Sequence, residues 1–347
     1  MEPSTVKPRL KVVGLHVENF RALRRVDWPE DGIGWNGQVP DVVMVGGVNG
    51  SGKTTLLELI ADAARMLRGD GPVMWSSSDT VNAWIDFQIQ SQSSGDFSFR
   101  VLLGNKPFTQ QYRTEECLRF VRTKTTFDPI EDGSARLIAH KLVTNPITYE
   151  PSDFPGIIYF PTERRFNIPD VPFKPIGDIE TPHEFFFKFK SAKNWGESLG
   201  ALLHAARWAD LNAKEEGTPE KANHFESYSK AFQLFFGDTK HLVWEGGKLF
   251  VKIDTTNERH QLMDLSSGEK QALIFAAELY RRWRPGSLIL IDEPELHFHP
   301  SWQTTLWTML EQMQKERGGQ VIVATQSTHL FLIAEPATKV LLGGPLG

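Results

Sequence analysis

The stretch "GVNGSGKT", residues 47–54, constrains this chain more than any other part of it. It fits the pattern G-x-x-x-x-G-K-[ST] in full, follows the apolar run "DVVMVGG" and opens the helix-like segment "TTLLELIADAARML". In that strand–loop–helix context, glycines let successive backbone N–H groups point inward at an anion, and the helix N-terminus adds its dipole. The stretch therefore predicts a phosphate-binding loop, and a glycine-rich turn with a chance lysine is the less favoured interpretation.

Lys53 is expected to reach the β- and γ-phosphates of ATP, and Thr54 is expected to ligate Mg²⁺. The residues assigned to phosphate binding are Gly47, Asn49, Gly50, Ser51, Gly52, Lys53, Thr54 and Thr55.

Composition excludes several classes of protein. The 347 residues are 40% hydrophobic and 23% charged, which is typical of one large or two ordinary globular domains. A net charge of −5 provides no general basic field, so DNA binding would need a local patch. The single cysteine, Cys117, excludes an internal disulfide framework. No apolar run approaches the ~18 residues that span a bilayer, and a cytoplasmic protein without a membrane partner is expected.

Both ends of the chain are predicted to be α/β. Short apolar strands alternate there with amphipathic helices, a pattern that favours a sheet covered on two faces. "RLKVVGLHVENFRAL" is predicted to be one strand, and "VNAWIDFQIQ" with "DFSFRVLL" a hairpin. The middle of the chain is dominated by a predicted helical pair, split at Gly217 and Pro219. It is interpreted as an insertion.

A second motif, "LILIDEPELHFHP", carries an apolar strand into Asp292 and Glu293. A carboxylate at the end of a buried strand is costly unless a cation or hydrogen bonds compensate it. Next to a phosphate loop, Asp292 is expected to orient Mg²⁺, and Glu293 to polarise the water that attacks the γ-phosphate. Without the phosphate loop, an acidic turn after a strand would explain the pair equally well.

A third motif, "DLSSGEKQAL", starts a predicted helix. Ser266 suits the N-cap position, and Glu269 three residues later completes a capping box. A serine hydroxyl beside an exposed helix N-terminus is also a good site for a phosphate. The two interpretations are compatible.

The order of the three motifs resembles that of the ATP-binding-cassette (ABC) superfamily of ATPases. "LHVENFRAL", "GVNGSGKTTLLELI" and "DEPELHFHP" narrow the resemblance to heads of the SMC, RecF and OLD-like kind, here without a TOPRIM nuclease domain. The resemblance implies a mixed sheet flanked by helices, an antiparallel β subdomain and a mostly helical insertion. It implies half-heads at residues 8–105 and 241–347, and the insertion at 106–240.

By the same resemblance, two heads sandwich two ATP molecules, and Ser266, Ser267 and Gly268 cap the ATP that the partner head holds. Arg21 is assigned to nucleotide binding, and Gln326 to catalysis in place of the switch histidine. Gln326 cannot gain a proton near neutral pH, and no glutamine stands clearly in the Q-loop position. Slow hydrolysis is therefore expected.

Other candidates are weaker. "FFFKFKSAKNW" interleaves aromatic and basic residues, as single-stranded nucleic acid binders do, but a core strand with solvated lysines is more common. Arg164 and Arg165 suit DNA, a phosphate or a surface ion pair equally well. His297 and His299 have metal-like spacing without evident further ligands, so a zinc site is rejected. His329 is a substitute for the switch histidine or a surface residue.

The favoured function is an ATPase that dimerises around ATP and regulates a separate effector, such as a nuclease or toxin. The resemblance suggests prokaryotic defence against phage or plasmids as its setting. A RecF-like repair ATPase that binds DNA directly is the alternative. The nucleotide-binding subunit of a membrane transporter is a poorer one, because the spacer between phosphate loop and "LSSGE" is much longer than in such subunits.

Overall fold

The computed structural model describes ten stretches of the chain. They are residues 9–29, 39–66, 80–90, 96–122, 127–130, 156–164, 195–218, 223–246, 248–335 and 337–343. Within these stretches the strands form a five-stranded, a six-stranded and a three-stranded sheet.

The five-stranded sheet is entirely parallel, in the order β14-β3-β13-β12-β8. Its strands are β3 (Val42–Gly47), β8 (Ile157–Phe160), β12 (Leu288–Asp292), β13 (Gln320–Thr325) and β14 (Thr338–Leu342). Every residue of β8, β12 and β13 is buried, as expected for strands covered on both faces. Because parallel strands end at the same edge, the residues that follow β3, β12 and β13 come together there.

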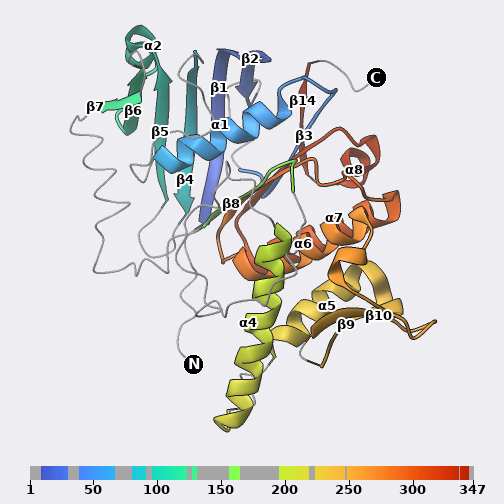
Figure 1. Ribbon diagram of the computed structural model, residues 1–347. Helices are drawn as coiled ribbons and strands as arrows, with labels where there is room; N and C mark the ends of the chain where they lie inside the picture. The colour runs from blue at the N-terminus through green and yellow to red at the C-terminus, as the bar shows by residue number, and fades with distance from the viewer. Residues whose placement is uncertain are drawn as a thin grey trace.

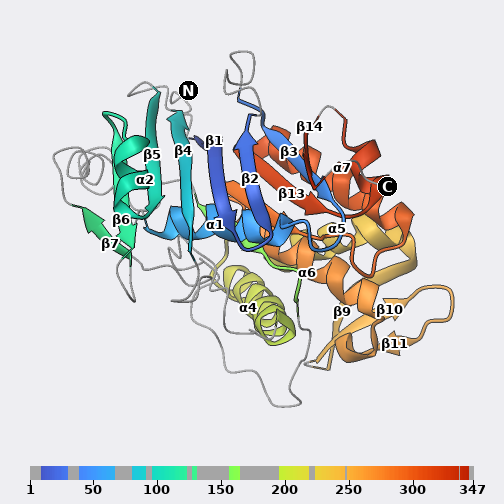
Figure 2. The ribbon, with the colours of Figure 1, turned by 90° about the horizontal axis from the view of Figure 1, so that it is seen from above.

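Alternate residues of this sheet enter two different cores. Val43 and Val45 face the core that contains helix α1 (Lys53–Met66), whereas Met44 between them faces the opposite core. Helix α1 contacts β3, β8, β12 and β13, and it shares its core with the six-stranded sheet. It is therefore packed between the two sheets (Figures 1 and 2).

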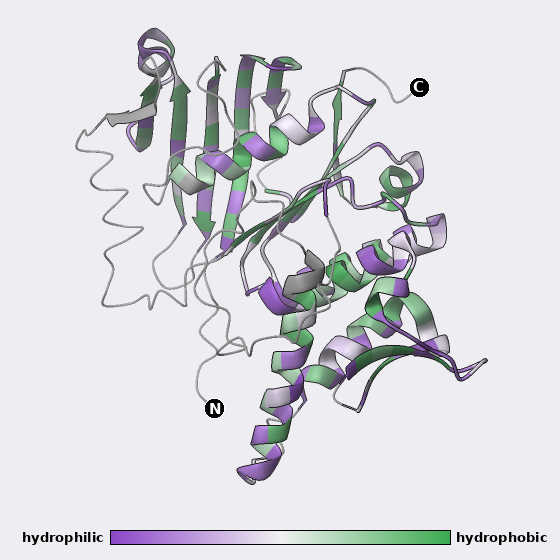
Figure 3. Cartoon of the chain, in the orientation of Figure 1, coloured by the Kyte–Doolittle hydropathy of each residue, from purple (hydrophilic) through white to green (hydrophobic). Residues whose placement is uncertain are grey.

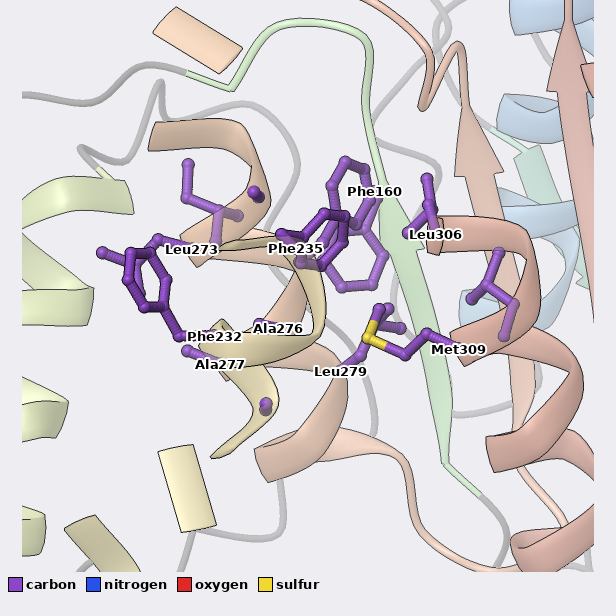
Figure 4. Close-up of a cluster of buried hydrophobic side chains, with 14 of the residues drawn as sticks. Phe160, Phe232, Phe235, Leu273, Ala276, Ala277, Leu279, Leu306 and Met309 are labelled. Atoms are coloured by element: carbon purple, nitrogen blue, oxygen red, sulfur yellow. The ribbon is translucent and has the colours of Figure 1, made fainter. Parts of the chain in front are cut away.

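The opposite face of the parallel sheet is covered by helices. They are α4 (Trp195–Glu215), α5 (His224–Phe236), α6 (Ser267–Arg282) and α7 (Pro300–Arg317), with the short α8 (Thr328–Ile333) beside α7. Figure 4 shows side chains from β8, α5, α6 and α7 in one cluster, including Phe160, Phe235, Leu273 and Leu306. Green predominates in this region in Figure 3, while the far end of α4 is largely purple.

The six-stranded sheet has the order β2-β1-β4-β5-β6-β7 and is antiparallel except for the β5–β6 pair. Its strands are β1 (Arg9–Phe20), β2 (Leu23–Trp28), β4 (Asn82–Gln90), β5 (Phe97–Gly104), β6 (Cys117–Arg122) and β7 (Phe127–Ile130). Helix α2 (Lys106–Gln111) connects β5 to β6. The parallel β5–β6 pairing follows from this crossover.

The small third sheet lies at the other end of the molecule, next to α5 (Figures 1 and 2). It has the order β11-β10-β9, with β9 (Lys240–Glu245), β10 (Lys248–Ile253) and β11 (Arg259–His260). Single 3₁₀ turns, η2 (Gly237–Thr239) and η3 (Leu262–Asp264), lie on either side of it in sequence.

The predicted fold class is confirmed: one sheet is parallel, and the six-stranded sheet is antiparallel apart from its β5–β6 pair. One prediction of detail was wrong, and one helix was missed. The N-terminal segment is a hairpin rather than one strand, because the chain turns at Arg21, whose φ is +51°. Helix α8 was not predicted. None of the helices in the described part of the chain has the length and hydropathy needed to cross a membrane.

The segment 106–240 does not stand apart from the sheets. Strands β6 and β7 extend the six-stranded sheet, and β8 forms an edge of the parallel sheet beside β12. Among the described residues of this segment, α4 and α5 correspond to the predicted helical pair. The reason is topological, since a strand distant in sequence can pair wherever a sheet edge is open.

Candidate functional site

The loop between β3 and α1 has the backbone that a phosphate-binding loop needs. Gly50 and Gly52 have φ values of +80° and +100°, in the left-handed region that side chains disfavour. Gly52 is also closely packed, because a Cβ there would overlap the Leu23 side chain. The residues at the tip, Val48 to Gly50, are exposed. The loop is thus curled on the edge of the sheet and open to solvent.

Lys53 is held inside this loop. Its side chain is only 4% exposed, and its Nζ donates to the carbonyl oxygens of Gly47 at 2.9 Å and Val48 at 3.2 Å. The same Nζ lies 3.7 Å from Oε1 of Glu293. The ammonium group is therefore placed between the phosphate loop and the carboxylates after β12.

Asp292 is fully buried at the end of β12. Its Oδ2 accepts hydrogen bonds from the hydroxyls of Thr54, at 2.7 Å, and of Thr162. Its Oδ1 is buried without a protein hydrogen-bond partner. Burial raises the pKa of Asp292 to about 6, although the two hydroxyls favour the carboxylate.

The oxygen atoms of Thr54 and Asp292 suit a magnesium ion. A partnerless buried carboxylate oxygen is costly unless something compensates it, and Mg²⁺ prefers oxygen ligands from one or two carboxylates together with substrate phosphates and water. Thr54, at the start of α1, and Asp292 fit that ligand set. The two residues are 238 positions apart in sequence.

Glu293 has a strained backbone, with φ at +45°. Its N–H donates to the Ala324 carbonyl at 2.8 Å, and its own carbonyl accepts from Arg164 Nη2 at 3.0 Å. Only 14% of its side chain is exposed. These bonds hold the carboxylate toward Lys53, at the edge where the phosphate loop opens.

Gln326 follows β13, the strand between β3 and β12, and is partly buried. Its backbone N–H donates to Oε1 of Glu295 at 2.9 Å. The same oxygen accepts from the Thr325 hydroxyl at 2.7 Å and from Ser327 N–H at 3.1 Å. Glu295 thus ties the segment that carries Gln326 to the turn after β12.

The turn that starts α6 is fixed from several sides. Ser266 is the N-cap and forms a reciprocal capping box with Glu269, as predicted. Glu269 also pairs with Lys240 of β9. A Cβ on Gly268 would lie 2.7 Å from the carbonyl oxygen of His297, so only glycine fits. Ser266 and Ser267 are exposed, while Gly268 and Glu269 are buried.

The predicted residues are distributed over two areas. Gly47 to Thr55, Asp292, Glu293 and Gln326 gather at one sheet edge, whereas Ser266, Ser267 and Gly268 lie in the turn beside His297. Arg21 binds Glu58 of α1 at 2.8 Å.

The other candidate residues have local partners. His329 Nε2 lies 3.2 Å from the Thr304 hydroxyl, and His299 caps α7. No phosphate-binding or metal-binding role is assigned to them.

The hypothesis that Arg164 contacts DNA is wrong. This arginine is buried and donates to main-chain carbonyls of the protein. Arg165 and the stretch 185–194 lie outside the described residues. Sequence reasoning assigned no role to Thr162 or Glu295. The polar "PTER" segment directly after an apolar strand was a signal that could have indicated Thr162.

Comparisons with known proteins match parts of this chain. Residues 217–332 match the family described as "AAA domain, putative AbiEii toxin, Type IV TA system". The chain is 33% identical over 111 residues to the "Retron Ec83 probable ATPase" of Escherichia coli, which covers 29% of this chain and 20% of that protein. It is 26% identical over 171 residues to the Septu protein PtuA of Bacillus thuringiensis, covering 46% and 40%. The matches thus span well under two thirds of either relative.

Solved structures that resemble this one include the SMC head domain from Thermotoga maritima, at 14% identity and a TM-score of 0.42, covering 95% of this chain and 93% of that one. A dimeric bacterial ABC transporter cassette matches at 14% identity and a TM-score of 0.38, covering 96% and 94%. These scores are too low to support an assignment. The sequence matches, together with the motifs assembled on one sheet edge, support an ABC-type ATPase head that contains an AAA domain.

Proposed function

We propose that this protein binds ATP with Mg²⁺, hydrolyses it slowly and dimerises head to head around the nucleotide, thereby regulating a separate effector. The observation that carries the proposal is the meeting of Thr54 and Asp292 beneath the phosphate loop, with Lys53 3.7 Å from Glu293. Phosphate-binding backbone, cation, metal-type oxygens and a candidate base are present within one site.

Each residue has a distinct task in this proposal. Residues 47–55 and the Lys53 ammonium bind the phosphates. Thr54 and Asp292 hold Mg²⁺, which when bound neutralises charge on the β- and γ-phosphates. Glu293 orients the attacking water and accepts its proton. Its strained backbone keeps the carboxylate at the sheet edge rather than in solvent.

In this proposal Gln326 donates a hydrogen bond to the γ-phosphate, which its position after the strand between β3 and β12 supports. A neutral amide supplies no proton and no charge, unlike an imidazolium. This difference is the basis for proposing slow turnover.

The dimer is proposed from the exposure of the two halves of the site. The phosphate-loop tip is exposed, and so are Ser266 and Ser267 at the N-terminus of α6. An exposed helix N-terminus with a serine cap attracts a phosphate. In a head-to-head pair, this turn of one copy would close the ATP site of the other.

The effector is proposed from the relatives. A retron ATPase and a Septu protein both match parts of this chain. We extend the likeness to a role in prokaryotic defence against phage or plasmids, with a nuclease or toxin as the separate effector. Residues 8–105 and 241–347 would form the head together with β6, β7 and β8, and α4 and α5 in the intervening segment would be available for contact with the effector.

The test uses Ser266→Arg, which places a bulky cation where the partner's phosphate would dock, and Lys53→Ala, which removes the phosphate ligand. Each protein alone should lack hydrolysis, and only Ser266→Arg should retain ATP binding. Mixed dimers contain one composite site with both wild-type elements, so mixing should restore part of the hydrolysis. Glu293→Gln should bind ATP and accumulate as a dimer in light scattering.

Thermal melting controls for folding, since a helix cap contributes only about 1 kcal/mol. A folded Ser266→Arg protein that no longer binds ATP would contradict the arrangement in trans, because it would place the turn at its own phosphate loop. A Glu293→Gln protein that binds ATP and stays monomeric would contradict the dimer.

A further inference from the structure

Arg164 is a buried cation whose hydrogen bonds all go to groups of the protein. It follows β8 in the "PTER" segment and is 6% exposed. Its Nη1 donates to the Asp292 carbonyl at 3.0 Å and also to the Pro161 carbonyl, and its Nη2 donates to the Glu293 carbonyl at 3.0 Å. One guanidinium thus holds the main chain of both carboxylate residues.

The remaining face of Arg164 is bound to α6. Its Nε donates to Oε1 of Gln271 at 2.7 Å, and Nε2 of Gln271 donates back to the Arg164 carbonyl at 3.0 Å. The guanidinium also lies 4.9 Å from the centre of the Phe275 ring, one turn further along α6. Gln271 is five residues after the N-cap Ser266, so this pair grips α6 within its first two turns.

The energetics favour a rigid link. Burial lowers the pKa of Arg164 to about 10, so the guanidinium remains charged at neutral pH. Charged hydrogen bonds are stronger than neutral ones, and a buried donor left without a partner costs about 1–3 kcal/mol. The turn after β12 and the start of α6 therefore cannot shift independently without breaking such a bond.

We propose that Arg164 and Gln271 are positioning residues. In each head they couple the carboxylate turn, which carries Asp292 and Glu293 at the end of β12, to the N-terminus of α6. This inference rests on the proposed function, in which those two places serve different ATP molecules. Binding of ATP beside Asp292 and Glu293 would then set the position of Ser266 and Ser267, which contact the ATP held by the partner head. The guanidinium would connect the two ATP sites of the dimer through one protomer.

The decisive variant is Gln271→Met, made in the Glu293→Gln background. It keeps the length of the side chain and removes both hydrogen bonds to Arg164, while the carbonyls of Asp292 and Glu293 keep their donors. Gln271→Glu retains the acceptor for Nε and should rescue most of the coupling. Gln320→Met is the matched control, because Gln320 is also buried and binds Val12 and Pro40, but at the opposite end of β13.

Four quantities are measured: the melting temperature, the ATP affinity of the isolated head, ATP-driven dimerisation, and amide hydrogen exchange in the presence and absence of ATP. Gln271→Met should bind ATP normally and dimerise about tenfold more weakly, the scale of a typical coupling between sites. Gln320→Met should lower only the melting temperature. At concentrations where the head is monomeric, ATP should alter amide hydrogen exchange at residues 266–270, and Gln271→Met should abolish that response.

If Gln271→Met melts earlier but dimerises and responds to ATP as Gln320→Met does, the link is only structural and the inference is wrong. That result would leave the proposed function intact. If the parent Glu293→Gln head binds no ATP, or binds it without dimerising, the proposed function fails and the inference fails with it. The parent protein therefore separates the two failures.

Discussion

Asp292 offers a test of the carboxylate site that needs no nucleotide. Its pKa is about 6 in the folded protein, against 3.8 for the unperturbed group, because burial disfavours the carboxylate. The folded state therefore binds a proton more tightly than the unfolded state. The resulting stabilisation is complete below pH 3.8 and is lost as the pH rises to about 6, above which it stays constant.

The size of the effect follows from the difference in pKa, about 2 units. At 1.36 kcal/mol per unit, the free energy of unfolding should fall by about 3 kcal/mol between these limits. The Thr54 and Thr162 hydroxyls and the Arg164 cation oppose the rise in pKa, and Glu293 adds to it. The effects of all four groups are already included in the pKa of about 6, so they require no separate correction to the expected change of about 3 kcal/mol.

The perturbation is Asp292→Asn, which cannot titrate. The amide oxygen can still accept from both threonine hydroxyls, so the substitution adds mainly an offset that does not depend on pH. Urea unfolding is measured in EDTA from pH 4 to pH 7.5, and the wild-type free energy is subtracted from that of the variant. Other carboxylates, such as Glu269 and Glu278, contribute equally to both proteins and cancel.

The difference should grow in favour of the variant by about 2.5 kcal/mol across this range, because a small part of the effect is already lost at pH 4. Adding Mg²⁺ at neutral pH should stabilise the wild type and leave Asp292→Asn unchanged, and the variant should lose hydrolysis. Parallel profiles for the two proteins in EDTA would refute the reasoning, because they would mean that Asp292 is ionised in the folded state at the pH of an ordinary carboxylate.

Two further predictions concern the segment after β13. Gln326→His should raise turnover or give it a pH dependence near the imidazole pKa of ~6.5, measured by phosphate release from pH 5.5 to 8; an unchanged rate at every pH would place Gln326 away from the γ-phosphate. Glu295→Leu removes the acceptor of three hydrogen bonds, so the free energy of unfolding in urea should fall by roughly 3 kcal/mol and turnover should fall with it. A loss of stability with normal turnover would show that Glu295 does not position Gln326.

The sequence by itself determined the local parts of the site. The phosphate loop, the strand ending in Asp292 and the capping box at Ser266 were all predicted, and the structure has each as a strand–loop–helix unit, a buried strand end and a helix start. These features depend on residues within a few positions of one another. Glycine conformations, alternation of apolar residues and helix capping act at that range, so the pattern alone is enough to predict them.

Only the tertiary structure decided which distant groups meet. Thr162 binds Asp292 across 130 residues, and Arg164 binds Gln271 across 107. The partners of Thr162 and Arg164 cannot be predicted from neighbouring residues, because the pairing of β8 with β12 and the packing of α6 beside them bring these groups together. Arg164 looked like a surface cation because sequence shows charge but not burial. Once buried, a guanidinium must satisfy its donors within the fold, and here the available acceptors are the carbonyls of the carboxylate turn and the first turns of α6.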